Sequence, residues 1–168
     1  MDIRYTIRET LPEDLPAILE ILNDAILNST AIYDETPKML PEMESWLETQ
    51  QNNGMPVYSC LVNNRTIGYG TYGRFRPKYG YRFTVEHSVY VEEFHRSAGI
   101  GQQLLTTLIQ RATADGLHRM VAGIDAENSG SIRFHLKNGF KQVGHLKEVG
   151  FKFGRYLDLV FLQLDLSK

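Results

Sequence analysis

A basic residue and two glycines precede a strongly amphipathic segment in the middle of the chain. The run is Arg96-Ser97-Ala98-Gly99-Ile100-Gly101, and it follows the apolar residues Val89-Tyr90-Val91. After it, apolar residues recur at helical spacing from Ile100 to Ala112. The first amides of a helix lack partners within the helix, and glycines let such amides approach an anion closely. With the arginine as an added cation, the segment predicts a pyrophosphate site.

Two other nucleotide-binding patterns do not fit this segment. A Walker loop requires Gly-Lys-Ser or Gly-Lys-Thr, but Gly101 is followed by Gln102-Gln103. A dinucleotide fingerprint requires three spaced glycines, and only Gly99 and Gly101 are present. Taken alone, two glycines before a helix fit a tight turn that binds nothing equally well.

The rest of the chain shows alternating strand and helix patterns. Alternation of apolar and polar residues, with β-branched residues, predicts strands over 3–8, 57–62, 66–72, 83–91, 119–125, 140–149 and 156–164. Helical spacing predicts helices after a capping box at 10–13, over 41–52, from 100 to a stop at 115–116, and over 128–137. Asn63-Asn64 is typical of a hairpin turn, and Gly68, Gly70 and Gly73 indicate a bulge or a close approach. This order predicts an α/β chain with a mixed sheet.

The composition is that of one globular domain, which we expect to span residues 1–168. A net charge of −2 and a pI near 6.2 give no support for a nucleic-acid or membrane-surface partner. The single cysteine, Cys60, excludes an intrachain disulfide and a paired-cysteine metal site, so we expect no metal. The N-terminal residues lack a signal-peptide pattern and no apolar run approaches 18 residues, so we expect a cytoplasmic protein.

Several stretches resemble one known superfamily of enzymes. Arg-x-x-Gly-x-Gly after a strand, at Arg96 to Gly101, resembles the acyl-CoA loop of the GNAT acetyltransferases. The run Asn128-x-x-Ser131-x-x-x-His135-x-x-x-Gly139-Phe140 resembles that family's Asn-x-x-Ala-x-x-x-Tyr-x-x-x-Gly-Phe segment. Residues 84–91 and 150–159 resemble the phosphinothricin N-acetyltransferase subfamily, which includes enzymes acting on methionine sulfone and methionine sulfoximine. The resemblance covers nearly the whole chain.

The resemblance implies a fold and a cofactor site. The fold would be a mixed, mostly antiparallel sheet of about seven strands, splayed between strands four and five and flanked by about four helices. The pantetheine arm of acetyl-CoA would pair with the exposed edge of strand four, and the pyrophosphate would rest on the glycine loop. Asn128 would contact the CoA arm and also cap its helix. The implied acetyl-CoA residues are Val89, Tyr90, Val91, Arg96, Ser97, Ala98, Gly99, Ile100, Gly101, Gln102 and Asn128.

Two residues are candidates for proton transfer in the reaction that the resemblance implies, direct attack of an amine on the thioester. Glu86 lies in the strand that leads to the CoA edge and is the candidate base, acting directly or through a water molecule. Its pKa would have to rise by burial if it acted directly on an ammonium group. His135 stands where many family members have a tyrosine acid. It could protonate the CoA sulfur or equally be a packed helix residue.

A small amino-acid acceptor needs cations for its anionic groups and an aromatic wall for its side chain. Phe75-Arg76 supplies both, and Tyr33, Lys152 and Arg155 are further candidates. The resemblance places the C-terminal stretch at or near an acceptor site that is shared in a homodimer.

The resemblance thus implies an acetyl-CoA-dependent N-acetyltransferase that modifies the α-amino group of a phosphinothricin, methionine sulfone or methionine sulfoximine type of substrate. Another amine acceptor is an alternative, although the basic residues 74–78 argue against a polycationic one. A non-catalytic acyl-CoA-binding module is a second alternative, against which an intact Glu86 weighs weakly.

Overall fold

The computed structural model describes residues 4–96 and 98–167, which form two compact units. Unit 1 consists of the described residues up to Asp24, Lys38–Gly73 and His87–Arg111, and unit 2 consists of Ala25–Pro37, Arg74–Glu86 and the described residues from Ala112 onward. Of the helices described, none is both long and apolar enough to cross a bilayer.

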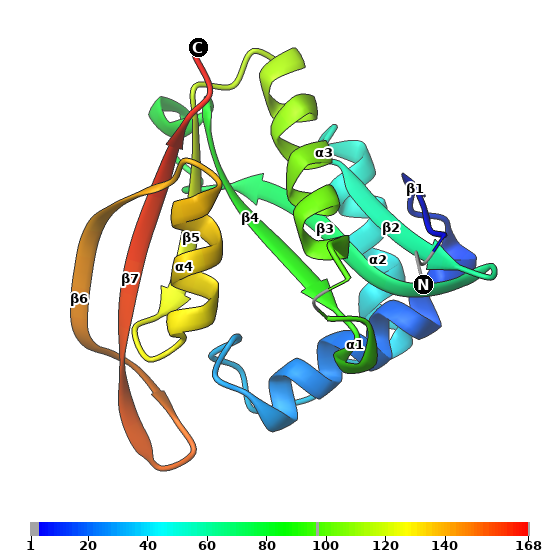
Figure 1. Ribbon diagram of the computed structural model, residues 1–168, viewed down its shortest axis with the longest axis horizontal. Coiled ribbons are helices and arrows are strands. Elements are labelled where there is room, and N and C mark those ends of the chain that lie inside the picture. Colours follow the sequence, from blue (N-terminus) through cyan, green and yellow to red (C-terminus); the bar gives the residue numbers. More distant parts are fainter. Residues whose placement is uncertain (1–3, 97, 168) are drawn as a thin grey trace. The chain divides into compact units, whose positions relative to one another are not determined.

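Unit 1 contains an antiparallel sheet and most of three helices (Figure 1). Strand β1 pairs with β2, and β2 pairs with β3. The elements that lie wholly or partly in this unit are β1 (Thr6–Glu9), α1 (Leu15–Asn28), α2 (Leu40–Asn52), β2 (Val57–Val62), β3 (Arg65–Arg74), β4 (Thr84–Val91) and α3 (Ile100–Ala114). Residue 3, the expected start of the first strand, lies outside the described residues.

The start of α1 differs in detail from the expected capping box. A short 3-10 turn, Pro12–Asp14, precedes the helix, and the carboxylate of Asp14 accepts the backbone N–H of Leu11 at 2.8 Å. The hydroxyl of Thr10 instead makes a 2.7 Å hydrogen bond with that of Ser59 on β2. The predicted capping box between Thr10 and Glu13 was therefore wrong, because the cap forms one residue later, between Leu11 and Asp14.

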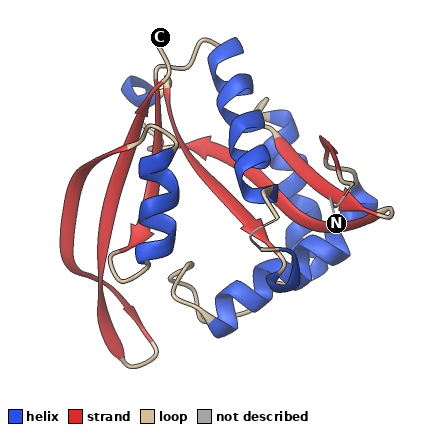
Figure 2. Ribbon diagram, in the orientation of Figure 1, coloured by secondary structure: helices blue, strands red, loops and turns tan. Residues whose placement is uncertain are grey.

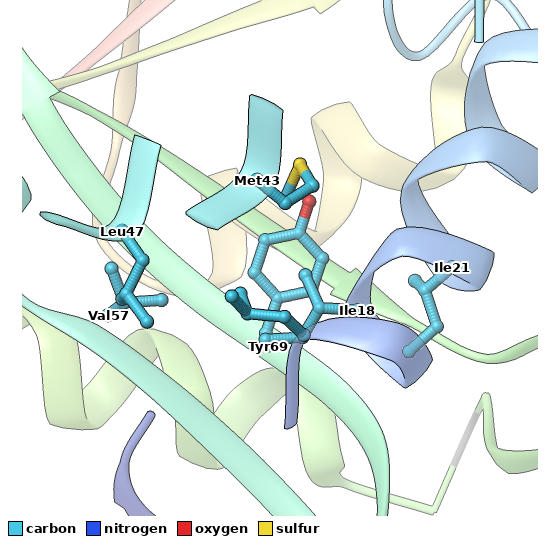
Figure 3. Close-up of a cluster of buried hydrophobic side chains, with 7 residues drawn as sticks. Ile18, Ile21, Met43, Leu47, Val57 and Tyr69 are labelled. Atoms are coloured by element: carbon cyan, nitrogen blue, oxygen red, sulfur yellow. The ribbon is translucent and has the colours of Figure 1, made fainter. Parts of the chain in front are cut away.

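Two apolar clusters form between the sheet and the helices of unit 1. The first joins α1, α2, β2 and β3, and Figure 3 shows the Tyr69 ring of β3 beside Ile18 and Met43. The second joins Ile100 and Leu104 of α3 to Cys60 and Ile67. Gly70 permits close packing of α3, because a Cβ there would lie 3.1 Å from Leu108. The close approach expected at this glycine is confirmed, whereas that expected at Gly73 was wrong, because a Cβ there would meet no atom within 4 Å.

Unit 2 is built on the other strands (Figure 2). Thr84–Glu86, the first part of β4, pair in parallel with Arg119–Val121. The remaining strands are antiparallel, and helix α4 lies against β5, β6 and β7. The further elements of this unit are β5 (Arg119–Asp125), α4 (Ser129–Lys137), β6 (Lys141–Lys152) and β7 (Arg155–Asp165).

Strand β6 contains a pronounced bulge where it pairs with β7. The register shifts between Leu146 and Gly150, so that three residues of β6 stand opposite Asp158 alone. The Asp158 carboxylate holds this bulge, because it accepts the backbone N–H of Glu148 at 2.8 Å and contacts Nε2 of His145 at 2.8 Å. Glu148 has a φ of 55°, an uncommon backbone conformation that the bulge requires.

The order of strands in the sheet is β1-β2-β3-β4-β5-β7-β6. Strand β4 belongs to both units, because Thr84–Glu86 lie in unit 2 and the rest of the strand lies in unit 1. All described pairings except that of β4 with β5 are antiparallel. The ladder of β4 and β5 covers only three residue pairs, which agrees with strands that splay at this point. The expected mixed, mostly antiparallel sheet of seven strands and four α-helices is confirmed for the described residues.

Candidate active site

The glycine loop of unit 1 has the backbone that an anion site needs. Gly99 has a φ of 78°, and a Cβ placed on it would meet no atom within 4 Å. Helix α3 begins at Ile100, so its first backbone N–H groups have no acceptor within the helix. Arg96 donates from Nε to the Val91 carbonyl at 3.1 Å, and its side chain is exposed. Ser97, also predicted to bind the cofactor, lies outside the described residues.

The strand residues expected to pair with the CoA arm lie at the end of β4. Val89 and Val91 pack against the apolar cluster that contains Ile100, and this contact holds the start of α3 against the strand. The Tyr90 ring lies 5.4 Å from that of Tyr69. The expected residues from Val89 to Gln102, Ser97 excepted, thus form one continuous strand, loop and helix start within unit 1.

Glu86 lies half-buried on β4 in unit 2, over a gap in the side chains of β5. Gly123 creates this gap, because a Cβ there would lie 2.9 Å from Oε1 of Glu86. Burial raises the pKa of Glu86 above its ordinary value, while the positive charge of Arg76 acts in the opposite direction. A carboxylate in this environment is a better proton acceptor than an exposed one.

Aromatic rings and a cation continue from Glu86 across the same unit. The Phe161 ring approaches to 3.6 Å of a Cβ built on Gly123, and the Phe75 ring lies 6.1 Å from the Phe161 ring. The Arg76 guanidinium lies 5.1 Å from the centre of the Phe75 ring. We call the set Glu86, Phe75, Arg76, Gly123 and Phe161 the acceptor face. It combines a half-buried carboxylate, a cation and an apolar wall.

Tyr33 is fixed by contacts within unit 2. Its hydroxyl donates to the backbone oxygen of Asp158 at 3.0 Å, and its ring lies over Gly150, where a Cβ would be 2.5 Å from two ring carbons. Nearby, Thr30 donates to the carboxylate of Asp125, two residues beyond Gly123 on β5. Burial, followed by the charges of Asp125 and Asp158, raises the pKa of Tyr33 to about 12. Its hydroxyl is therefore a hydrogen-bond donor and not a base.

The two predicted basic residues of the β6–β7 hairpin have different surroundings. Arg155 makes a two-pronged ion pair with Glu127 at 2.9 and 3.2 Å, and both side chains are substantially exposed. Lys152 is fully buried, and its Nζ donates to the carbonyls of Ile26, Ser29 and Ile32 at 2.5 to 2.7 Å. Since the ammonium has three N–H donors and donates to three carbonyls, this geometry does not support direct contact of Lys152 with an acceptor.

His135 is packed inside unit 2, on helix α4. Its Nδ1 lies 2.7 Å from the Ser131 carbonyl, which requires a proton on that nitrogen, and its ring packs edge-on against Phe140 at 5.1 Å. Burial lowers its pKa, and the bond to Ser131 acts against this. A buried histidine that donates its Nδ1 proton to its own helix favours the packed interpretation over that of an acid.

Asn128 caps helix α4, as expected. Its side-chain oxygen accepts the Ser131 N–H at 3.0 Å, so the oxygen is engaged and the amide NH₂ is the group suited to donate to a ligand.

Sequence reasoning missed Gly123 and Phe161. The available signal was a glycine inside an apolar strand, which commonly marks a close approach by another group. Only the register of β5 with β7, where Gly123 stands opposite Phe161, shows which groups approach it.

Comparison with known proteins agrees with this fold. The model of the acetyltransferase (GNAT) domain family matches residues 7–161, and the chain belongs to this family. It is 48% identical over 163 residues to the L-methionine sulfoximine/L-methionine sulfone acetyltransferase of Pseudomonas aeruginosa, covering 96% of this chain and 95% of that protein. It is 36% identical to the phosphinothricin N-acetyltransferase of Alcaligenes faecalis, covering 96% and 83% of the two chains.

A solved acetyltransferase from Salmonella typhimurium, which contains its cofactor acetyl-CoA, superposes with a TM-score of 0.95 at 42% identity. The match covers 98% of this chain and 95% of that one. The chain is thus an acetyltransferase that uses acetyl-CoA. Within residues 4–96 and 98–167, no group of three or more His, Cys, Asp or Glu side chains is arranged to hold a metal ion.

Proposed function

We propose that this enzyme acetylates the α-amino group of a small amino acid with a polar, tetrahedral head, such as methionine sulfone, methionine sulfoximine or phosphinothricin. The acceptor face is the observation that carries the proposal. It places a half-buried carboxylate, a guanidinium and two aromatic rings on one unit, with groups for the amine, the anionic portion and the chain of such a molecule. The names of the relatives at 48% and 36% identity support the same class of acceptor.

In the proposed reaction, Glu86 accepts a proton from the acceptor's ammonium group, directly or through water. The neutral nitrogen then forms a bond to the thioester carbon, the carbon–sulfur bond breaks, and the CoA thiolate takes up the proton that the nitrogen loses as it becomes an amide. The raised pKa of Glu86 narrows the gap between the base and an ordinary amine, which favours the first step. His135 is not assigned the final protonation, because its Nδ1 proton is held by Ser131.

Binding roles follow from charge and shape. Arg76 is proposed to pair with the acceptor's anionic group, and Phe75 and Phe161 are proposed to contact its chain. Tyr33 would supply a further wall, and Arg155 would act at the rim if an acceptor draws it from Glu127. We propose that the strand, loop and helix start from Val89 to Gln102 bind acetyl-CoA. The side-chain amide of Asn128 is proposed as a further donor to this cofactor.

We further propose that the enzyme is a cytoplasmic homodimer. Large apolar side chains are exposed along the β6–β7 hairpin, among them Val149, Phe151, Phe153 and Tyr156, each at least half exposed. Contiguous apolar exposure of this kind marks protein-binding surfaces. Sedimentation analysis tests this part of the proposal, and a monomer at micromolar concentration would contradict it.

An acceptor screen with acetyl-CoA tests the function, using thiol release as the signal. We expect release with methionine sulfone, methionine sulfoximine or phosphinothricin, and much less with spermidine or an aminoglycoside. Faster thiol release with spermidine or the aminoglycoside would contradict the proposed acceptor class and favour a polycationic acceptor. No release with any of these three amino acids would contradict the proposed acceptor class.

A further inference from the structure

The buried ammonium of Lys152 donates to the end of α1 and to the segment that carries Tyr33. We propose that Lys152 is a positioning residue for acceptor binding: together with Glu35, it fixes the segment 29–35 so that Tyr33 stands against the β6–β7 hairpin. The inference rests on the proposed function, in which Tyr33 forms part of the acceptor wall.

The contacts of the ammonium match its donors one for one. An ammonium group has three N–H donors, and Nζ donates to Ile26 in the last turn of α1 and to Ser29 and Ile32 beyond it. The carbonyls at the end of a helix have no partners within it and carry partial negative charge, so a cation is favourable there. One side chain thereby joins the end of the helix to the segment that follows it.

Burial also explains why a lysine is needed. Desolvation lowers the pKa of Lys152, while the charges of Glu35 and Asp34 raise it. An arginine would not serve equally well, because its planar guanidinium spreads its donors in one plane. A methionine would fill similar space but leave three carbonyls without donors.

A second contact holds the segment on the other side of Tyr33. The carboxylate of Glu35 accepts the backbone N–H of Phe153 at 2.9 Å, immediately after Lys152. Tyr33 therefore lies between two attachments to the same hairpin turn. Its own hydroxyl bond to Asp158 places the ring, while the flanking contacts place its backbone.

The test compares Lys152→Met with Lys141→Met, the same substitution at an exposed position of the same strand. We expect the acceptor KM of Lys152→Met to rise about tenfold or more, with the dissociation constant of acetyl-CoA within about twofold of that of the unaltered enzyme. Hydrogen exchange of the amides in residues 29–35 should become faster, with little change in β5. Lys141→Met should resemble the unaltered enzyme in every measurement.

An unchanged acceptor KM in folded Lys152→Met would overturn the proposal, as would equal losses of acceptor and acetyl-CoA binding. If Lys152→Met does not fold, Glu35→Ala decides the question, since Glu35 is exposed. This variant should raise the acceptor KM in the same direction, and an unchanged value would overturn the proposal. Failure of the proposed function would appear separately, as absence of acceptor turnover in the unaltered enzyme.

Discussion

Replacing Gly150 by alanine tests whether Tyr33 is held as the structure describes. A methyl group at this position would lie 2.5 Å from two carbons of the Tyr33 ring, where carbon atoms normally approach to about 3.5–4.0 Å. Gly150 does not have a positive φ, so alanine can adopt its backbone conformation. The cost would therefore come from the ring, which has to move by about 1 Å or more.

The magnitude follows from two contributions. Overpacking a buried site costs about 1–3 kcal/mol, and loss of the Tyr33 bond to the Asp158 carbonyl adds about 1 kcal/mol. A total near 3 kcal/mol would lower Tm by roughly 9 °C in a chain of this size, at about 3 °C per kcal/mol. The displaced ring should also raise the acceptor KM while acetyl-CoA affinity is retained.

A double-mutant cycle with Tyr33→Ala isolates this contact. In the Tyr33→Ala background, Gly150→Ala should be neutral or stabilising by about 0.5 kcal/mol, because the obstructing ring is gone. Gly144→Ala on the same strand is the matched control, since its Cβ would meet Phe161 at an ordinary 3.9 Å. Thermal unfolding of the four proteins gives the coupling free energy. If Gly150→Ala costs the same with and without the ring, Tyr33 does not occupy this position and the reasoning is refuted.

Three further predictions concern the chemistry. Glu86→Gln should lower kcat by about 10²–10⁴-fold and leave acetyl-CoA binding intact in calorimetry, and normal turnover would remove Glu86 from the mechanism. Gly99→Trp should abolish acetyl-CoA binding, because it fills the space above the loop and disfavours a φ of 78°; normal affinity in calorimetry would show the loop assignment to be wrong. Arg76→Ala removes the charge that lowers the pKa of Glu86, so this pKa should rise further and less carboxylate should be present at a given pH. A carbon-13 NMR titration measures it, with Glu86→Gln to assign the signal, and a lower pKa would contradict the arrangement.

Patterns local in the chain were predicted well from the sequence. The strands 57–62 and 119–125 have the expected bounds, and Asn63 and Asn64 both have positive φ, as their hairpin turn requires. Asn128 caps its helix and Gly99 opens the loop as expected. In each case the signal lies in the residue types themselves and their near neighbours.

What the sequence could not give depends on contacts between distant segments. From the sequence, Lys152 is a candidate for acceptor binding beside Phe153, and nothing nearby in the chain indicates three carbonyls about 120 residues away. Likewise, His135 fits an acid or a packed residue until the ring of Phe140 and the Ser131 carbonyl are placed around it. The role of Gly123 appears only when β4, β5 and β7 are in register.

The bulge in β6 limits how another chain could attach to this end of the sheet. Strand β6 is the last strand in the order, and an edge strand can template the addition of a further strand and so lead to aggregation. Between Leu146 and Gly150 the ladder is interrupted, so an incoming straight strand could follow β6 on one side of the bulge but not along its whole length. The bulge that Asp158 maintains thus disfavours the repeated addition of strands that would form a fibre. It leaves the side chains of the hairpin exposed for a specific contact.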